Sequence, residues 1–241
     1  MQSTSRSAAI AAELRDEILR GQYRCGERLP SERDLAERYG VHRGAIREAL
    51  KRLEQLGVAE CHPGGARVSP IEEASLDIVE HLINLEDPPD PAIVDQTLEV
   101  LSGLFSMAAR LCAERASDSQ RAVIREVLAQ AKKQVPNAER IALMHRLVDL
   151  FVEASGNMVL KLVRRGVKTD FIEQLEERHP HLMPPLSPNK TIYDRLGEAI
   201  DAKDGAAASD AVIELTRELR GHAIAAITNE RERLSLQRMS S

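Results

Sequence analysis

The sequence predicts a mainly α-helical protein: an N-terminal head of helices with one small β-hairpin, followed by an all-α bundle of six or seven helices. Two observations lead to this fold class. Apolar residues recur every three or four positions along most of the 241 residues, which is the period of an amphipathic helix. One glycine-rich stretch near residue 64 breaks that period and has the turn chemistry of a hairpin. With 43% hydrophobic and 29% charged residues, the chain has the composition of a globular protein.

We expect four regions along the chain. The head covers residues 1–70, and a linker helix with a proline-rich break covers 71–90. An all-α domain covers 91–228 and a polar tail covers 229–241. Three strong apolar stripes predict long helices in the all-α domain, and weaker patterns predict further helices around 119–133, 158–177 and 190–202.

Glycines separate the predicted helices of the head. The first helix lies within residues 8–19 and is followed by Gly21. The second begins after Ser31, a favourable N-cap, and ends at Gly40, a favourable residue for a helix C-terminus. The third covers residues 42–56 and follows the second after a very short turn. Two helices joined in this way form a helix-turn-helix.

A β-hairpin is expected directly after the third helix. Gly57 ends the helical period, and the short segments 58–62 and 66–69 flank the turn sequence Pro63-Gly64-Gly65. A hairpin beside a helix-turn-helix is a wing, so the head is predicted to be a winged helix-turn-helix.

The third helix has one basic face. Arg43, Arg47 and Lys51 are spaced at i, i+4 and i+8, so they share a face. Arginine can donate two hydrogen bonds to guanine in the major groove, and the first residues of such a helix meet the base edges. The candidates for base contact are therefore His42, Arg43 and Arg47, and the small Gly44 permits close approach. The alternative is an ordinary solvated face, since Glu48 and Glu54 interrupt the basic residues.

The wing favours the nucleic-acid interpretation. His62 and Arg67 flank the glycine-rich tip, from which they could contact phosphates or the minor groove. The net charge of −5 would argue against a nucleic-acid partner, but residues 1–70 carry 12 basic and 10 acidic residues and are slightly positive. A mildly basic head on an acidic body is compatible with DNA binding through one face of the head.

The run from residue 8 to 68 resembles the DNA-binding head of the GntR family of bacterial transcription regulators. The resemblance rests on G-E-R-L-P-S-E-R-D-L-A, on G-V-H-R-G-A-I-R-E-A-L-K-R-L and on the glycine wing. It implies DNA contacts from Arg33, Arg43, Arg47, His62, Gly64 and Gly65. Two features depart from the family pattern. His42 replaces a common Ser or Thr, which removes a good N-cap, and the wing is one residue shorter.

The body resembles the FadR-type subfamily. The segment Phe151-Val-Glu-Ala-Ser-Gly-Asn157 is similar to a motif that ends one helix of its effector domain. The resemblance implies a homodimer that binds a palindromic operator in double-stranded DNA and responds to a small effector, which usually releases the DNA and relieves repression. The three widely spaced cysteines predict a cytoplasmic location, because they favour a reducing compartment. Many members hold a metal with one Asp and three His, and the metal grips a carboxylate effector.

The expected metal-ligand positions hold other residues in this chain: Met144, Val148, Tyr193 and Leu215. Such side chains cannot replace imidazole and carboxylate ligands, so we expect neither a metal nor a cofactor. Two further positions that are often polar are Leu101 and Phe105. We therefore expect an apolar effector of fatty acyl-CoA type. The residues expected to line its cavity are Leu101, Phe105, Met144, Val148, Phe151, Asn157, Tyr193 and Leu215.

Other readings stay open at this point. An apolar stripe more commonly forms core than ligand lining, and Asn157 can simply cap a helix. The protein could be a ligand-free dimeric regulator or could respond to a small organic acid. An enzyme is not expected, because no nucleotide-binding loop, G-x-S-x-G or H-E-x-x-H motif is present. No apolar run is long enough to span a membrane, and three distant cysteines predict no disulfide framework.

Overall fold

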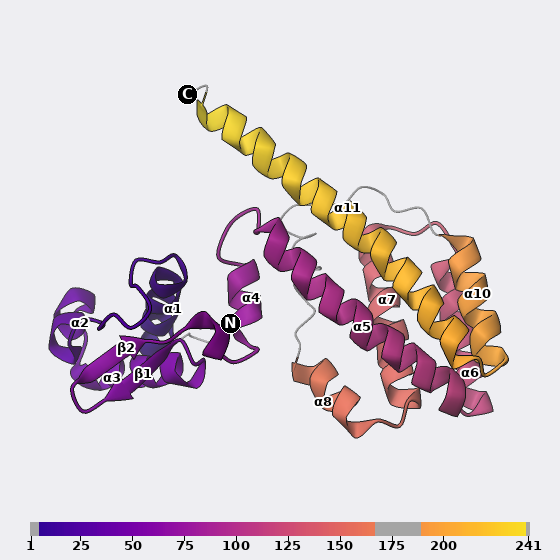
Figure 1. The fold of residues 1–241 in the computed structure, drawn as a ribbon, viewed down its shortest axis with the longest axis horizontal. Coiled ribbons are helices and arrows are strands. Elements are labelled where there is room, and N and C mark those ends of the chain that lie inside the picture. Colours follow the sequence, from indigo (N-terminus) through magenta and orange to yellow (C-terminus); the bar gives the residue numbers. More distant parts are fainter. Residues whose placement is uncertain (1–4, 167–188, 240–241) are drawn as a thin grey trace. The chain divides into compact units, whose positions relative to one another are not determined.

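The computed structural model describes residues 5–166 and 189–239, which form two compact units divided after Asp87 (Figure 1). Each unit has its own apolar core. The predicted fold class is confirmed, with the hairpin in the first unit and only helices among the described elements of the second. The predicted segment 167–177 lies outside the described residues.

The first unit contains three helices, a two-stranded antiparallel sheet and two short helical segments. Its elements are α1 (Arg6–Leu19), α2 (Glu32–Tyr39), α3 (Arg43–Gln55), β1 (Ala59–His62), β2 (Gly65–Val68), the 3-10 turn η1 (Ile71–Glu73) and α4 (Ile78–Ile83). The strands pair from Ala59 opposite Val68 to His62 opposite Gly65, so Pro63 and Gly64 form a two-residue loop.

Local sequence signals explain where α2 and α3 begin and end. Ser31 accepts a hydrogen bond from the backbone N–H of Asp34 and so caps α2. Gly40 ends α2 in the left-handed conformation, with φ of 61°, which costs glycine little. α3 begins after His42, whose side chain makes no capping hydrogen bond. The expected loss of the cap at this position is confirmed.

The core of the head fixes the orientation of α3. Its residues Ile46, Ala49 and Leu53 have no exposed surface, and α3 packs against α1, α2 and β1. Leu14 of α1 and Leu35 of α2 are also fully buried in this cluster. Burial of this apolar face leaves the opposite face of α3 in solvent.

The head extends beyond the expected boundary at residue 70. Ile78 of α4 is buried in the head core, and the N–H of Ser75 donates to the carbonyl of Leu56 at 2.9 Å. Arg20 also donates to the carbonyl of Leu85 at 3.1 Å. Residues 71–87, which we expected to be a linker, therefore belong to the first compact unit.

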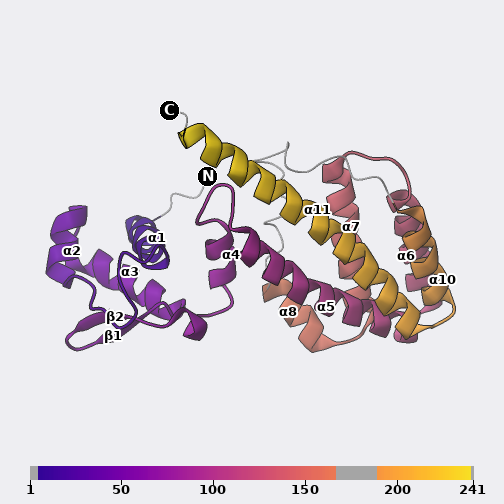
Figure 2. The same cartoon turned by 45° about the horizontal axis from the view of Figure 1, so that its top comes forward.

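The second unit is built on two long antiparallel helices. The described helices are α5 (Pro91–Arg115), α6 (Asp118–Ala131), α7 (Asn137–Ala154), α8 (Met158–Gly166), α10 (Lys190–Asp201) and α11 (Gly205–Met239). α5 and α11 lie side by side in both views (Figures 1 and 2) and contact each other more extensively than any other pair. Asp95 pairs with Arg220 in two hydrogen bonds of 2.5 and 2.7 Å.

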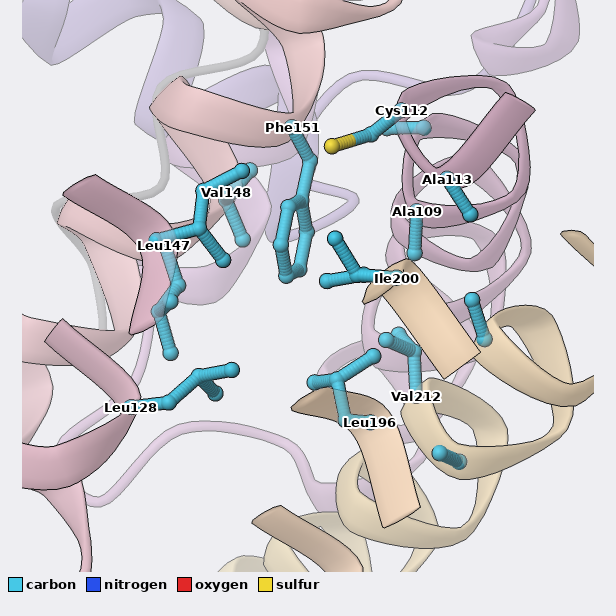
Figure 3. Packing of buried hydrophobic residues seen from close by; sticks show 14 of the residues in the cluster. Ala109, Cys112, Ala113, Leu128, Leu147, Val148, Phe151, Leu196, Ile200 and Val212 are labelled. Atoms are coloured by element: carbon cyan, nitrogen blue, oxygen red, sulfur yellow. The ribbon is translucent and has the colours of Figure 1, made fainter. Parts of the chain in front are cut away.

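The body core gathers aliphatic side chains from α5, α6, α7, α10 and α11 and one, Leu160, from α8 (Figure 3). Phe151 of α7 lies in this cluster with Cys112 of α5 and Ile200 of α10. With aromatic residues at only 2% of the chain, closely packed aliphatic groups provide nearly all of the apolar burial. Burial also raises the pKa of the Cys112 thiol to about 11.

Three arginines satisfy carbonyl groups near helix C-termini in the body. Arg115 donates to the carbonyl of Ser155 after α7 at 2.8 Å. Arg121 donates to the carbonyl of Ala116 after α5. Arg140 donates to carbonyls at and beyond the end of α6, each at 3.2 Å. These bonds satisfy carbonyls that have no partner within their own helix.

The polar tail expected at 229–241 is helical as far as Met239, because α11 continues without interruption. No proline interrupts the segment after Thr228. Arg231 anchors its first part by donating to the carbonyl of Pro88 at 2.9 Å. Glu230 is buried and pairs with Arg233 within the same helix. The segment is polar in composition, and a polar composition does not exclude a helix.

Gly57→Ala should destabilise the head. Gly57 has φ of 73°, and an added Cβ would lie 2.9 Å from the Cα of Ala74. The positive φ alone costs a non-glycine residue about 1–2 kcal/mol, and the backbone contact adds to this. Urea unfolding followed by circular dichroism measures the loss.

Gly44→Ala is the matched control, because its Cβ would meet nothing within 4 Å and it lies inside α3. Alanine there should leave stability unchanged or raise it by up to about 1 kcal/mol. Equal stability of the Gly57→Ala variant and the wild-type protein would contradict the packing of residues 73–75 against the head.

Candidate nucleic-acid interface

The exposed face of α3 carries the residues singled out from the sequence. His42, Arg43, Gly44 and Arg47 are all exposed, and they occupy the first turns of α3 directly after the turn from α2. Because the opposite side of α3 is buried, this face is held outward by the fold. The chain therefore presents the N-terminal part of a basic helix to solvent, as a major-groove reader requires.

The three basic residues of α3 have different environments. Lys51 pairs with Glu48 at 2.9 Å. Arg47 donates through Nε and Nη2 to both carboxylate oxygens of Glu32, at 3.1 and 2.8 Å. Arg43 forms no hydrogen bond or ion pair with any residue that the structure describes. Its guanidinium is thus available to a ligand at the start of the helix.

α2 contributes a fourth basic side chain. Arg33 is the second residue of α2, and 75% of its side chain is exposed. Its ion pair with Asp34 is long, at 3.5 Å, and an exposed pair of this kind is weak. Arg33 can therefore exchange Asp34 for a phosphate or a base without a large cost.

Hydrogen bonds hold the wing against the rest of the head. Glu54 of α3 accepts a hydrogen bond from the N–H of Cys61 in β1 at 3.0 Å. On the other strand, Arg67 donates to the carbonyl of Gly26 at 2.9 Å. Arg67 was expected to contact DNA, but part of its hydrogen-bonding capacity is used to position β2. His62 lies at the tip and pairs with Glu60 at 3.2 Å.

The structure adds Arg28, which sequence reasoning missed, to this surface. An added Cβ on Gly65 would lie 3.0 Å from Nε and 3.1 Å from Nη2 of Arg28, so the guanidinium lies against the wing glycines. The backbone of Arg28 also pairs with that of Arg67 in an isolated antiparallel β-bridge. Arg28 lies 37 residues before Gly65, so the sequence did not indicate this contact. The only sign of a role in DNA binding was that Arg28 is the basic residue of G-E-R-L-P.

The body contains a small apolar pocket between α5, α7 and α8. The pocket is partly open, and the space in it and at its mouth amounts to about 280 Å³, open solvent included. Six apolar side chains and one arginine line it: Leu101, Leu104, Phe105, Val152, Leu160, Val163 and Arg164. Arg164 pairs with Asp149 at 2.9 Å.

Two of the eight expected lining residues, Leu101 and Phe105, line this pocket. Val148, Phe151, Tyr193 and Leu215 are instead buried in the body core, and Met144 packs at the edge of that core. Asn157 accepts hydrogen bonds from the N–H groups of Val159 and Leu160 and so caps α8. The positions of Val148, Phe151 and Leu215 agree with the alternative interpretation, in which the apolar stripes form core.

The side chains at the family's metal positions do not fit a metal. Val148 and Leu215 have no donor atom, and the Tyr193 hydroxyl faces the sulfur of Met144 at 3.7 Å. Burial raises the pKa of Tyr193, which disfavours a phenolate ligand. Among the described residues, no group of three or more His, Cys, Asp or Glu side chains could hold a metal ion.

Within the ranges 5–166 and 189–239, no helix is both long and apolar enough to cross a membrane.

Comparison with known proteins agrees with the geometry of both units. Residues 6–68 match the family "Bacterial regulatory proteins, gntR family", and residues 96–218 match the FCD domain. The chain is 28% identical to the HTH-type transcriptional regulator Mce2R of Mycobacterium tuberculosis over 214 residues, 86% of each chain. It is 31% identical to the fatty acid metabolism regulator protein of Yersinia pestis over 156 residues, 64% of each chain.

Among solved structures, a GntR family member from Pseudomonas syringae pv. tomato is 19% identical, with a TM-score of 0.48 and coverage of 97% of this chain and 89% of that one. The two family matches cover the head and most of the body, and the GntR model and the two relatives are named as regulators. The chain therefore belongs to the GntR family of DNA-binding transcription regulators, with a C-terminal FCD domain of the FadR type.

Proposed function

We propose that the protein binds a palindromic operator as a homodimer, with α3 of each head in the major groove. The observation that carries this proposal is the exposed basic face of α3, which includes Arg43, on a helix whose other face is buried. A two-fold dimer would present two such helices to two half-sites. Action on genomic DNA would place the protein in the cytoplasm.

Each candidate residue has a distinct role in this proposal. Arg43 and Arg47 read base edges, and His42 and Gly44 lie at the same end of the helix. Arg33 and Arg28 approach the phosphates. The wing tip, with His62, Gly64 and Gly65, lies against the backbone or in the minor groove.

We further propose that the FCD domain binds an apolar effector of fatty acyl type. Support comes from the pocket, whose lining is apolar apart from Arg164. An apolar chain with an anionic end would suit six apolar side chains and one cationic one. One relative is named for the regulation of fatty acid metabolism. Effector binding would shift the heads from a DNA-binding state to one that releases DNA. A coupling free energy of about 1–3 kcal/mol between the effector site and the DNA site is enough for this shift.

Arg43→Ala should weaken binding to the selected operator by about 1–3 kcal/mol, because a bidentate contact to guanine is lost. Fluorescence anisotropy with labelled duplexes measures this. Lys51→Ala is the control, because Lys51 lies two turns further along the same helix and its ammonium group is paired with Glu48. Unchanged operator affinity of a folded Arg43→Ala variant would refute the role of α3 in base recognition.

Arg28→Ala should weaken binding to all duplexes to a similar extent. The logarithm of affinity should fall linearly with the logarithm of salt concentration, and removal of one phosphate contact should reduce that slope by about one. Titrations at several salt concentrations supply the slope. A salt-dependence slope equal to that of the wild-type protein would contradict a phosphate contact by Arg28.

Leu104→Glu should abolish the response to a long-chain acyl-CoA while DNA binding stays intact. Leu104 is half-buried in the pocket lining, and a carboxylate there opposes an apolar chain. Met107→Glu is the control, because Met107 lies on the same helix but is exposed. The assay is release of labelled operator on titration with palmitoyl-CoA.

The result of that titration also separates the alternatives. Release by a small organic acid instead of palmitoyl-CoA would favour a polar effector, and no release by either would favour a ligand-free regulator. Both results would contradict the proposed fatty acyl effector and leave the DNA-binding proposal standing.

A further inference from the structure

Glu32 and Arg47 form a two-point contact across the helix-turn-helix. Glu32 is the first residue of α2, and Arg47 is the fifth residue of α3. Nε of Arg47 donates to one carboxylate oxygen at 3.1 Å, and Nη2 donates to the other at 2.8 Å. Two parallel bonds fix the plane of the guanidinium as well as its position. The contact therefore limits the freedom of a long side chain at the proposed DNA surface.

This pairing leaves the other edge of Arg47 available. A guanidinium has five N–H groups, and Glu32 engages one on Nε and one on Nη2. Both N–H groups of Nη1 and the second of Nη2 stay outside the contact. These groups form the end of the guanidinium, which can donate two parallel bonds to O6 and N7 of guanine. Glu32 and a guanine could thus bind Arg47 at the same time.

The charge of Glu32 is well suited to this arrangement. The hydrogen bond from Arg47, with the nearby charges of Arg47 and Arg43, lowers the pKa of Glu32. Glu32 is therefore a carboxylate at neutral pH, and a bare carboxylate would repel DNA. Its close pairing with Arg47 offsets that repulsion.

The contact contributes little to holding the head together. The side chain of Arg47 is 62% exposed and that of Glu32 is 34% exposed, and exposed ion pairs add little to stability. The apolar residues of α3 already hold it against the core. Arg43 and Lys51 have no comparable two-point partner on the described surface. The restraint is thus specific to Arg47.

We propose that Glu32 is a positioning residue that orients Arg47 for the recognition of one guanine in each half-site. The inference rests on the proposed function of α3. In it, Glu32 has no contact with DNA and acts only through the guanidinium of Arg47. Loss of Glu32 should reduce discrimination between sequences, whereas loss of a simple repulsive charge should strengthen binding to all sequences.

The experiment begins with selection of duplexes from a random pool by the wild-type protein. Affinities for the selected operator and for a scrambled duplex are then measured for wild type, Glu32→Gln and Glu48→Gln. Glu48→Gln is the matched control, because it removes the same charge from the same surface but breaks only the pair with Lys51. Urea midpoints verify that each variant is folded.

The expected result is a lower ratio of operator to scrambled affinity for Glu32→Gln, by roughly tenfold, with the same ratio as wild type for Glu48→Gln. Repeating the selection with Glu32→Gln should relax the preference at one guanine per half-site. In an Arg47→Ala background, Glu32→Gln should leave the ratio unchanged, because the residue through which it acts is absent.

A Glu32→Gln variant that keeps the wild-type ratio, or that strengthens binding to both duplexes as Glu48→Gln does, would overturn the positioning role alone. The same holds if Glu32→Gln lowers the ratio equally with and without Arg47. A wild-type protein that selects no sequence would overturn the proposed function and this inference together.

Discussion

Burial of one face of α3 is the constraint on which the head depends. Ile46, Ala49 and Leu53 are withdrawn from solvent completely. Burial of a side chain as large as isoleucine or leucine contributes about 1.5–3 kcal/mol relative to exposure. A helix anchored in this way has no freedom to rotate about its axis. The basic residues between the apolar ones are therefore forced outward, so that the core, through α3, determines the surface that meets DNA.

Hydrogen bonds then fix the orientation of the wing and of surface side chains on the framework that the core provides. Glu54, at first sight a charge that dilutes the basic face, accepts the Cys61 N–H and ties the wing to α3. Arg67 ties the other strand to Gly26. Glu32 restrains Arg47. Acidic residues interspersed along a basic surface can thus organise that surface rather than weaken it.

Small side chains control the packing of the body. Ala108, Ala109 and Ala113 of α5 and Ala208 and Ala211 of α11 have no exposed surface, which permits close approach of these long antiparallel helices. At Gly205 an added Cβ would lie 2.8 Å from the Cγ of Arg110. With few aromatic residues, the body reaches a dense core through close helix contact, and its apolar pocket forms at the edge where α8 joins α5 and α7.

The sequence by itself determined the features that arise from local chemistry. Ser31, Gly40 and Gly57 mark helix boundaries because capping and positive φ depend on neighbouring residues alone. The period of apolar residues identified the inner and outer faces of α3, and the family resemblance of the head followed from contiguous residues.

Only the tertiary structure decided which distant side chains meet. The contact of Arg28 with Gly65 and the extension of the head to Asp87 are long-range. The distinction between core and pocket in the body is long-range too. Val148, Leu215 and Leu101 are all apolar residues at helical spacing. Val148 and Leu215 are nevertheless buried in the core, whereas Leu101 borders the pocket. The reason is that an apolar period specifies that a face is covered, whereas the packing of other helices specifies what covers it.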